Sequence, residues 1–196
     1  MNVKYNIRTL DNLLQTKLKS YDEATDTFDS NHEFYWGGKA GDKLSHHMVP
    51  LAYHYMYLYD FDFYSYVDIG AARCPNVYIK TFDKCYLFEP DDGEHLALID
   101  KFTNNSDVKL YDEFIDDMNT LDGYNLSCDL LKIDTDGNDG KVIIGSEITL
   151  VREKPLVFVE DLTNQTEALE CLKDNNFIEV SGKTYSNKFY VHSERL

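Results

Sequence analysis

Short runs of apolar residues alternate with helical segments along the chain from residue 64 onward. Each run has the length and the branched or aromatic side chains that are typical of a β-strand. The predicted strands are residues 64–69, 85–88, 108–111, 130–133, 156–159, 177–180 and 189–192, and the predicted helices are residues 75–82, 91–103, 139–153 and 164–175.

This alternation predicts an α/β fold. Strands that are joined through helices form βαβ units, so we expect a mostly parallel sheet with helices on both faces. Pro75, Pro90 and Pro155 lie at joints between elements, where a missing backbone N–H is tolerated. The last two strands are separated only by a short stretch that contains Ser181 and Gly182, which predicts an antiparallel hairpin.

Before residue 60 the pattern is helical or irregular instead. Residues 3–21 carry apolar side chains at steps of three and four, which predicts an amphipathic helix. A second helical stretch at about 43–58 is rich in Tyr and His and is interrupted by Pro50. We therefore expect a helical N-terminal extension over residues 1–60 and one α/β domain over residues 61–196.

Composition narrows the kind of partner. The 196 residues include 35 Asp and Glu but only 19 Lys and Arg, which gives a formal net charge of −16. This balance argues against binding nucleic acid through its phosphate backbone and against docking on anionic membranes. The chain has no apolar run near the ~18 residues of a membrane span, and its first residues lack the apolar stretch of a signal peptide. We expect a soluble, cytoplasmic protein.

The turn after the first strand of the α/β domain is the first candidate for ligand binding. Asp68 lies at the end of an apolar run and is followed by Gly70 and Ala71. Small residues let the backbone approach a ligand closely, and the helix expected after this turn offers free N–H groups. Glu89 follows the second strand, 21 residues after Asp68, where a carboxylate can accept hydrogen bonds from the two hydroxyls of a ribose.

The segment 128–140 is the second candidate. It places Asp134 and Asp136 at the carboxyl end of a strand, where open α/β sheets bind ligands. Residues two apart on an extended chain point the same way, so these carboxylates can converge as a general base, an anchor for a substrate hydroxyl or a divalent-cation site. A Mg²⁺ or Ca²⁺ site that also uses Asp139 is not favoured, because a helix cap is the simpler role for Asp139.

Taken in order, these segments resemble the FkbM family of S-adenosylmethionine-dependent methyltransferases. The matching strings are VDIGA at 67–71, FEP at 88–90, TLDGY at 120–124, DLLKIDTDG at 129–137 and PLVFVE at 155–160. The resemblance implies a class I methyltransferase (Rossmann-like) fold, in which the last strand of a mostly parallel seven-stranded sheet is antiparallel. It also implies S-adenosylmethionine as the cofactor and transfer of a methyl group to a hydroxyl oxygen of a sugar or another small metabolite.

Carried over by position, the resemblance assigns cofactor contacts to single residues. Asp68, Gly70 and Ala71 would line the turn around the methionine part of the cofactor. Glu89 would bind the ribose hydroxyls. Asp112, which follows the third strand beside Tyr111, would contact the adenine.

Transfer to a hydroxyl needs the oxygen aligned with the methyl group and its proton removed as the new bond forms. By the same resemblance Asp134 would face the transferring methyl group, so Asp134 and Asp136 are candidate bases. His47, from the N-terminal extension, is a third candidate, and Trp36 beside a Gly pair is a candidate lid. Packing within the extension is the alternative role for both.

Two other classes of function remain open. The family usually has Asn and Gly where this chain has Ala72 and Cys74, and a Cβ at Cys74 would crowd the backbone if that residue needs a positive φ. This difference favours a non-catalytic binding module that has a methyltransferase-like fold. A nicotinamide-dependent oxidoreductase is the weaker alternative, because the first turn has a single Gly where GxGxxG is expected.

Overall fold

The computed structural model describes residues 21–22, 27–28, 52–53, 55–72, 74, 79, 81–160, 162–181 and 187–196. The chain divides into two compact units, Met1–Leu58 and Tyr59–Leu196. All of the sheet elements that carry the candidate site belong to the second unit.

The first unit contains a short β-pair that the sequence pattern did not predict. Strand β1 (Tyr21–Asp22) pairs antiparallel with β2 (Thr27–Phe28), so Tyr21, the last residue of the helix predicted at 3–21, lies in a strand. Aromatic and β-branched residues supply three of these four positions and favour extended backbone. Residues 52–53 and 55–58 are helical, within the stretch predicted at 43–58. Residues 3–20 of the first predicted helix lie outside the described residues.

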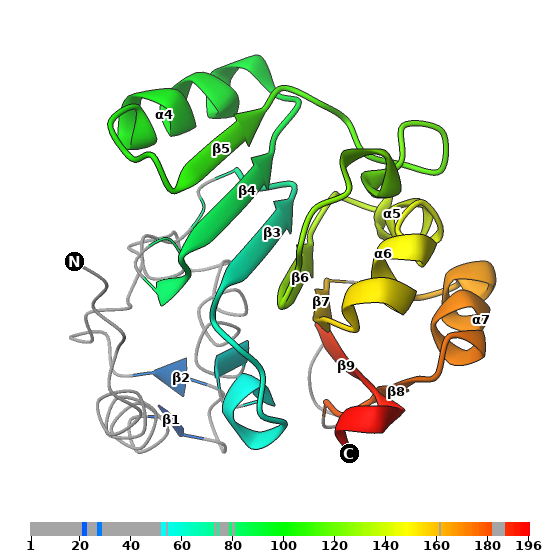
Figure 1. The fold of residues 1–196 in the computed structure, drawn as a ribbon. Helices are drawn as coiled ribbons and strands as arrows, with labels where there is room; N and C mark the ends of the chain where they lie inside the picture. The colour runs from blue at the N-terminus through cyan, green and yellow to red at the C-terminus, as the bar shows by residue number, and fades with distance from the viewer. Residues whose placement is uncertain are drawn as a thin grey trace. The chain divides into compact units, whose positions relative to one another are not determined.

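A seven-stranded sheet forms the centre of the second unit, in the order β5-β4-β3-β6-β7-β9-β8 (Figure 1). Neighbours from β5 to β7 pair in parallel, whereas β9 runs antiparallel to both β7 and β8. This confirms the predicted fold class, including the C-terminal antiparallel hairpin. The strands are β3 (Ser65–Ile69), β4 (Lys84–Phe88), β5 (Val108–Tyr111), β6 (Leu130–Ile133), β7 (Leu156–Val159), β8 (Phe177–Glu179) and β9 (Lys188–His192).

Of the three predicted helices that the structure describes throughout, one differs from the prediction, whereas residues 75–78 and 80 of the predicted helix 75–82 lie outside the described residues. The expected helix over 139–153 is two helices, because Gly145 ends the first one and its Cα lies against a neighbouring loop. A Cβ at Gly145 would lie 2.1 Å from the carbonyl oxygen of Asp116. Among the described residues, no helix is both long enough and apolar enough to cross a membrane. The helices are α4 (Asp92–Phe102), α5 (Asp139–Ile144), α6 (Glu147–Glu153) and α7 (Thr166–Asp174), with 3-10 turns η1 (Leu121–Tyr124) and η2 (Ser193–Arg195).

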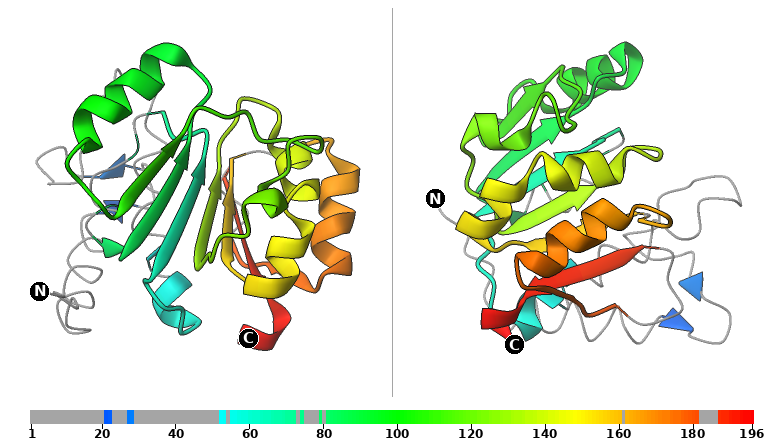
Figure 2. Two further views of the ribbon diagram at one scale, coloured as in Figure 1. Left: turned by 45° about the horizontal axis from the view of Figure 1, so that its top comes forward. Right: turned by 90° about the vertical axis from the view of Figure 1, so that its right-hand side faces the viewer.

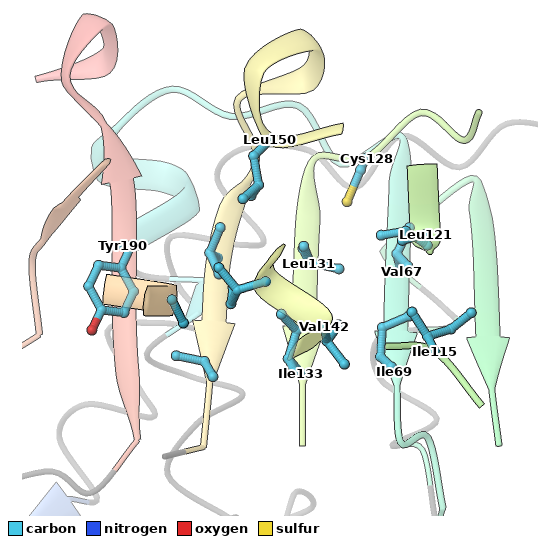
Figure 3. Close-up of a cluster of buried hydrophobic side chains, with 14 of the residues drawn as sticks. Val67, Ile69, Ile115, Leu121, Cys128, Leu131, Ile133, Val142, Leu150 and Tyr190 are labelled. Carbon is cyan, nitrogen blue, oxygen red and sulfur yellow. The ribbon is translucent and has the colours of Figure 1, made fainter. Parts of the chain in front are cut away.

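Helices cover both faces of the sheet (Figure 2). Alternate residues of a strand point to opposite faces, and one face packs on α5, α6 and α7 through a buried apolar cluster (Figure 3). The buried residues of α4, Leu98 and Phe102, lie outside that cluster. Helix α4 covers the other face, as right-handed crossovers in opposite directions along the sheet require. The cluster includes Val67, Ile69, Leu131, Ile133, Val157, Val159, Val142, Leu150 and Leu172.

Helix α6 receives its N-terminal cap from a residue far away in the sequence. One carboxylate oxygen of Asp122, in η1, accepts a hydrogen bond from Ile148 N at 2.9 Å. The other accepts from Thr149 N and from the Thr149 hydroxyl, both at 2.7 Å. This carboxylate satisfies two of the amides that every helix leaves without an internal partner.

One aromatic ring of the connection from β5 to β6 packs against rings of β4 and β5. Residues 112–129 contain the 3-10 turn η1 but no α-helix. Phe88 and Tyr111 stack with centroids 4.4 Å apart, and the Tyr124 ring lies edge-on to both of them. These rings shield the end of the sheet beside Glu89.

Candidate functional site

The carboxyl ends of β3, β4 and β6 bring most of the predicted site residues together. Gly70 N and Ala71 N both donate to Phe88 O at 3.0 Å, and Asp134 N donates to Ile69 O at 3.0 Å. Gly70 has φ +76°, and a Cβ there would lie 1.9 Å from Asp134 O. The glycine is therefore needed for two turns to meet at this edge, where open α/β sheets place their ligands.

Glu89 ties the first turn to the start of α4. One of its carboxylate oxygens accepts from Ala72 N at 2.7 Å and the other from Asp91 N at 2.9 Å. The side chain is 6% exposed. Because a carboxylate can accept about four hydrogen bonds, each oxygen keeps capacity for one more donor.

The unusual residues in the first turn behave differently from one another. Ala72 has φ +33°, in the region that favours Gly or Asn. Residue 73, which precedes Cys74, lies outside the described residues, so crowding by a Cβ at Cys74 stays a prediction. Cys74 is buried and forms no disulfide, and burial is the main reason that the pKa of its thiol is raised well above the ordinary value.

Asp68 lies beneath the turn and is not accessible to a ligand. It is 0% exposed, and its two carboxylate oxygens accept from the Lys132 ammonium at 2.8 Å and from the Tyr66 hydroxyl at 2.6 Å. Burial raises the pKa of Asp68, although Lys132 and Tyr66 oppose this shift. Direct contact with a cofactor, as the resemblance implies, would require these hydrogen bonds to open; Asp68 instead orients Lys132.

Lys132 links Asp68 to Asp134. Its ammonium lies 2.8 Å from Asp68, 3.5 Å from Asp134 Oδ2 and 3.3 Å from the carbonyl oxygen of Gly70. Burial alone would lower the pKa of Lys132, but the two carboxylates outweigh it and the pKa is raised. Lys132 is therefore a fixed cation that holds one carboxylate below the surface and another at the surface.

Glu160 extends this row of charges to the end of β7. Its backbone amide donates to Ile133 O at 3.0 Å, and it follows Val159, which pairs with Ile133, so Glu160 lies beside Asp134 at the ends of two neighbouring strands. Burial and the neighbouring carboxyl groups, Asp134 foremost, raise the pKa of Glu160 to about 7. The side chain of Asp134 is 37% exposed, so this end of the row is open to ligands.

The other two aspartates of the 128–140 segment have different environments. Asp136 is exposed in a turn with φ +49°. Asp139 is buried, and its carboxylate accepts from Thr135 N at 2.9 Å and from the Thr135 hydroxyl at 2.6 Å. Asp139 thus fixes the preceding loop rather than capping α5. Within the described part of the chain, no group of three potential ligands is arranged to hold a metal ion.

The third strand brings Tyr111 to the site, with Asp112 next to it. Glu89 N donates to Tyr111 O at 3.0 Å, and Asp112 is exposed directly after β5. Asp112 is exposed there, and its predicted contact with an adenine stays a prediction. His47 and Trp36 lie outside the described residues, so their roles stay predictions.

Sequence reasoning missed Lys132 and Glu160. Both lie in segments that carry the resemblance to the FkbM family, DLLKIDTDG at 129–137 and PLVFVE at 155–160. A signal for Lys132 was present, because a lysine within an otherwise apolar buried strand needs a partner. The partner is Asp68, which stands directly opposite Lys132 in the β3–β6 register.

A groove of about 340 Å³ lies between α5 and α7. Its walls include Gly140, Lys141, Gln165 and Glu167. Asp68, Glu89, Asp134 and Glu160 do not line it. The groove is therefore separate from the row of charged side chains.

Structural comparison relates the chain to known methyltransferases. The ribosomal protein L11 methylase from Lactobacillus delbrueckii subsp. bulgaricus aligns with a TM-score of 0.50 and 13% identity, over 80% of this chain and 88% of that chain. A chain described as a putative rRNA methylase from Clostridium thermocellum aligns with a TM-score of 0.50 and 13% identity, over 71% of this chain and 92% of that chain. A chain described as the putative methyltransferase yhhF from Escherichia coli aligns with a TM-score of 0.50 and 10% identity, over 79% of this chain and 88% of that chain.

Methyltransferase FkbM from Methylobacillus flagellatus KT aligns over 96% of this chain with a TM-score of 0.49 and 10% identity. This chain covers 61% of the length of that protein. No protein-family model matches the chain, and no curated protein matches it in sequence. At these identities the comparison concerns the fold, and the chain has the fold of class I S-adenosylmethionine-dependent methyltransferases.

Proposed function

We propose that the protein is an S-adenosylmethionine-dependent methyltransferase of the FkbM type. It transfers a methyl group to a hydroxyl of a small acceptor such as a sugar. The observation that carries this proposal is the edge of the sheet at which Glu89, the Gly70 turn and Asp134 meet. The cofactor would supply the activated methyl group.

The residues at this edge fit such a cofactor. Among the described contacts each carboxylate oxygen of Glu89 accepts one hydrogen bond and has capacity for one more, which matches the two donors of a ribose diol. The turn of Gly70 and Ala71 would lie beside the methionine part. Asp134 at the open end of the charged row is suited to a ligand that carries positive charge, as a sulfonium does. Asp112, which follows Tyr111, would lie near the adenine of the cofactor.

Charge favours a small uncharged acceptor over a nucleic acid. Asp134, Asp136 and Glu160 stand at the mouth of the proposed site, and the whole chain carries a net charge of −16. Phosphate groups would be repelled there. A hydroxyl, by contrast, can donate its hydrogen to one of these carboxylates.

Calorimetric titration with S-adenosylhomocysteine tests the cofactor assignment. We expect saturable binding by the wild type and a loss of at least about tenfold in affinity for Glu89→Ala, because a charged acceptor of two hydrogen bonds is removed. Asp100→Ala changes an exposed carboxylate on α4 and is the matched control. A folded wild-type protein that does not bind this compound would overturn the proposal.

The second candidate function, a non-catalytic binding module, is favoured by the backbone at Ala72. A positive φ at alanine shows that this turn departs from the residue type that its conformation favours. The same titration separates the two functions, because a module that has lost the cofactor site would not bind S-adenosylhomocysteine.

A further inference from the structure

Asp134 and Glu160 form a pair of acidic residues at neighbouring positions of the sheet, one after β6 and one after β7. Each residue directly follows a strand, and each backbone amide continues the ladder onto the neighbouring strand, at 3.0 Å to Ile69 O and to Ile133 O respectively. Adjacent strands lie ~4.8 Å apart, so the two side chains start from neighbouring positions. Regular backbone, not a loose loop, therefore sets their separation.

The surroundings of the two carboxyl groups differ, which determines where a shared proton resides. Asp134 lies 3.5 Å from the Lys132 ammonium, which favours its ionised form. The nearest cation on the adjacent strand β9, Lys188, lies 3.0 Å from Glu179 instead. Burial and the carboxylates of Asp134, Asp139 and Asp136 instead raise the pKa of Glu160. The proton of the pair therefore belongs to Glu160.

We propose that Glu160 is the proton acceptor of this site and that Asp134, held by Lys132, is the partner that positions it. This inference rests on the proposed methyltransferase function and names a base that the sequence did not. Of the other acids, Asp68 is fully buried with both oxygens occupied, and Asp136 lies in an exposed turn without a hydrogen bond that fixes its carboxylate in any described contact.

The step that Glu160 serves balances as follows. The O–H bond of the acceptor hydroxyl breaks, and its proton goes to a carboxylate oxygen of Glu160. The electron pair left on oxygen forms the new C–O bond to the methyl group, while the pair of the broken C–S bond stays on the cofactor sulfur. Glu160 must be ionised at the start, so a cation bound beside the pair would prepare it by displacing the shared proton.

The first test measures the proton itself. Carbon-13 NMR of protein labelled at the glutamate side-chain carboxyls should show Glu160 titrating near pH 7, assigned by its loss in Glu160→Gln. Asp134→Asn removes the charged partner and should shift this titration downward by about one pH unit or more. Glu170→Gln, an exposed change on α7, should leave it in place. A Glu160 titration at the ordinary value, or one that Asp134→Asn does not move, would overturn the inference.

The second test places the pair beside the reacting centre without needing the acceptor. S-adenosylmethionine and S-adenosylhomocysteine differ by the charged methyl sulfonium, so calorimetry in buffers of different ionisation enthalpy can compare the protons released by each. At pH 6.5 the charged ligand should release up to about three quarters of a proton more than the neutral one. This excess should disappear in Glu160→Gln and persist in Glu170→Gln.

The outcomes separate this inference from the proposed function. If the wild type binds neither ligand, both fall. If both ligands bind with equal proton release, the cofactor assignment stands and the role of Glu160 falls. Loss of S-adenosylhomocysteine binding in Glu160→Gln would make Glu160 a cofactor ligand instead of a base. Glu160→Asp, which keeps the carboxyl group, should restore part of the excess proton release.

Discussion

The two faces of strands β3 and β6 use the same backbone for opposite purposes. Toward α5 to α7 these strands present Val67, Ile69, Leu131 and Ile133, all buried in one apolar cluster. Toward the other face, Asp68 and Lys132 stand opposite each other in register, with Tyr66 bonded to Asp68. Alternation along two short strands thus separates a packing surface from a charged one.

The difference lies in how each face tolerates change. Apolar packing is non-directional, so its loss costs roughly what the missing contacts and the cavity are worth. The charged face depends on every partner being present, because each buried charge is compensated by one or two named atoms. It also ends in side chains that reach the surface, at Asp134 and Glu160, whereas the apolar face does not.

Removing the cation should have the largest effect. We expect Lys132→Met to lower the free energy of unfolding by about 3–5 kcal/mol, because the Asp68 carboxylate stays buried without its counter-charge. Adding Asp68→Asn should recover at least half of this loss in urea unfolding. Additive losses in the double variant would mean that the two side chains are not coupled, and the contrast between the faces would fail.

A cavity on the apolar face is the matched comparison. Leu131→Ala changes the neighbour of Lys132 on the same strand and should cost about 3 kcal/mol. Here no second substitution of a charged residue should restore stability, and the loss should be the same at pH 5 and pH 8. A strong pH dependence would show that the apolar face is electrostatically linked to the charged one.

A change of pH should alter the contribution of the charged face to stability, but not that of the apolar face. The pKa of Glu160 is raised from 4.5 to about 7 in the folded chain, so the folded state binds its proton more tightly than the unfolded state does. This contribution to stability is present below about pH 4.5 and is lost as the pH rises to about 7. Glu160→Gln should therefore flatten the fall in stability over this window, measured by urea unfolding at pH 4.5, 6 and 8. An unchanged slope would contradict the assignment.

The smallest change in stability is expected for a substitution at Ala72, in the turn that follows β3. Ala72→Asn places a residue that tolerates positive φ at this position, so we expect a gain in stability of about 1 kcal/mol or less. Ala97→Asn, on the exposed side of α4, should instead lose a few tenths of a kcal/mol through helix propensity. Thermal unfolding of the two variants compares them directly; a loss at Ala72 would show that its backbone is not strained.

The strands were predictable because parallel strands covered on both faces are short, nearly continuous apolar runs. The predicted bounds of β5, β6 and β7 are those of the structure. Each of the other four predicted strands differs from the structure by one residue at one end. The break between α5 and α6 was not predictable. It depends on the approach of Asp116 to Gly145, which no local pattern encodes.

For the site, sequence reasoning located the turns but not the connections between side chains. Glu89 and Asp134 follow strands, so their position at the carboxyl edge came from the chain pattern alone. The roles of Asp68, Lys132 and Glu160 depend on which strands are neighbours and in which register they pair. That information appears only once the sheet is assembled.

The cap on α6 has a consequence for the order in which the chain folds. A helix of seven residues does not persist alone in water, and the carboxylate that completes its first turn belongs to Asp122, which precedes β6. Helix α6 and the η1 turn therefore acquire their structure together, although strand β6 and helix α5 separate them in the sequence. Their backbone amides should therefore exchange hydrogen with solvent as one cooperative unit. This unit packs on the apolar face of the sheet through Leu121 and Leu150.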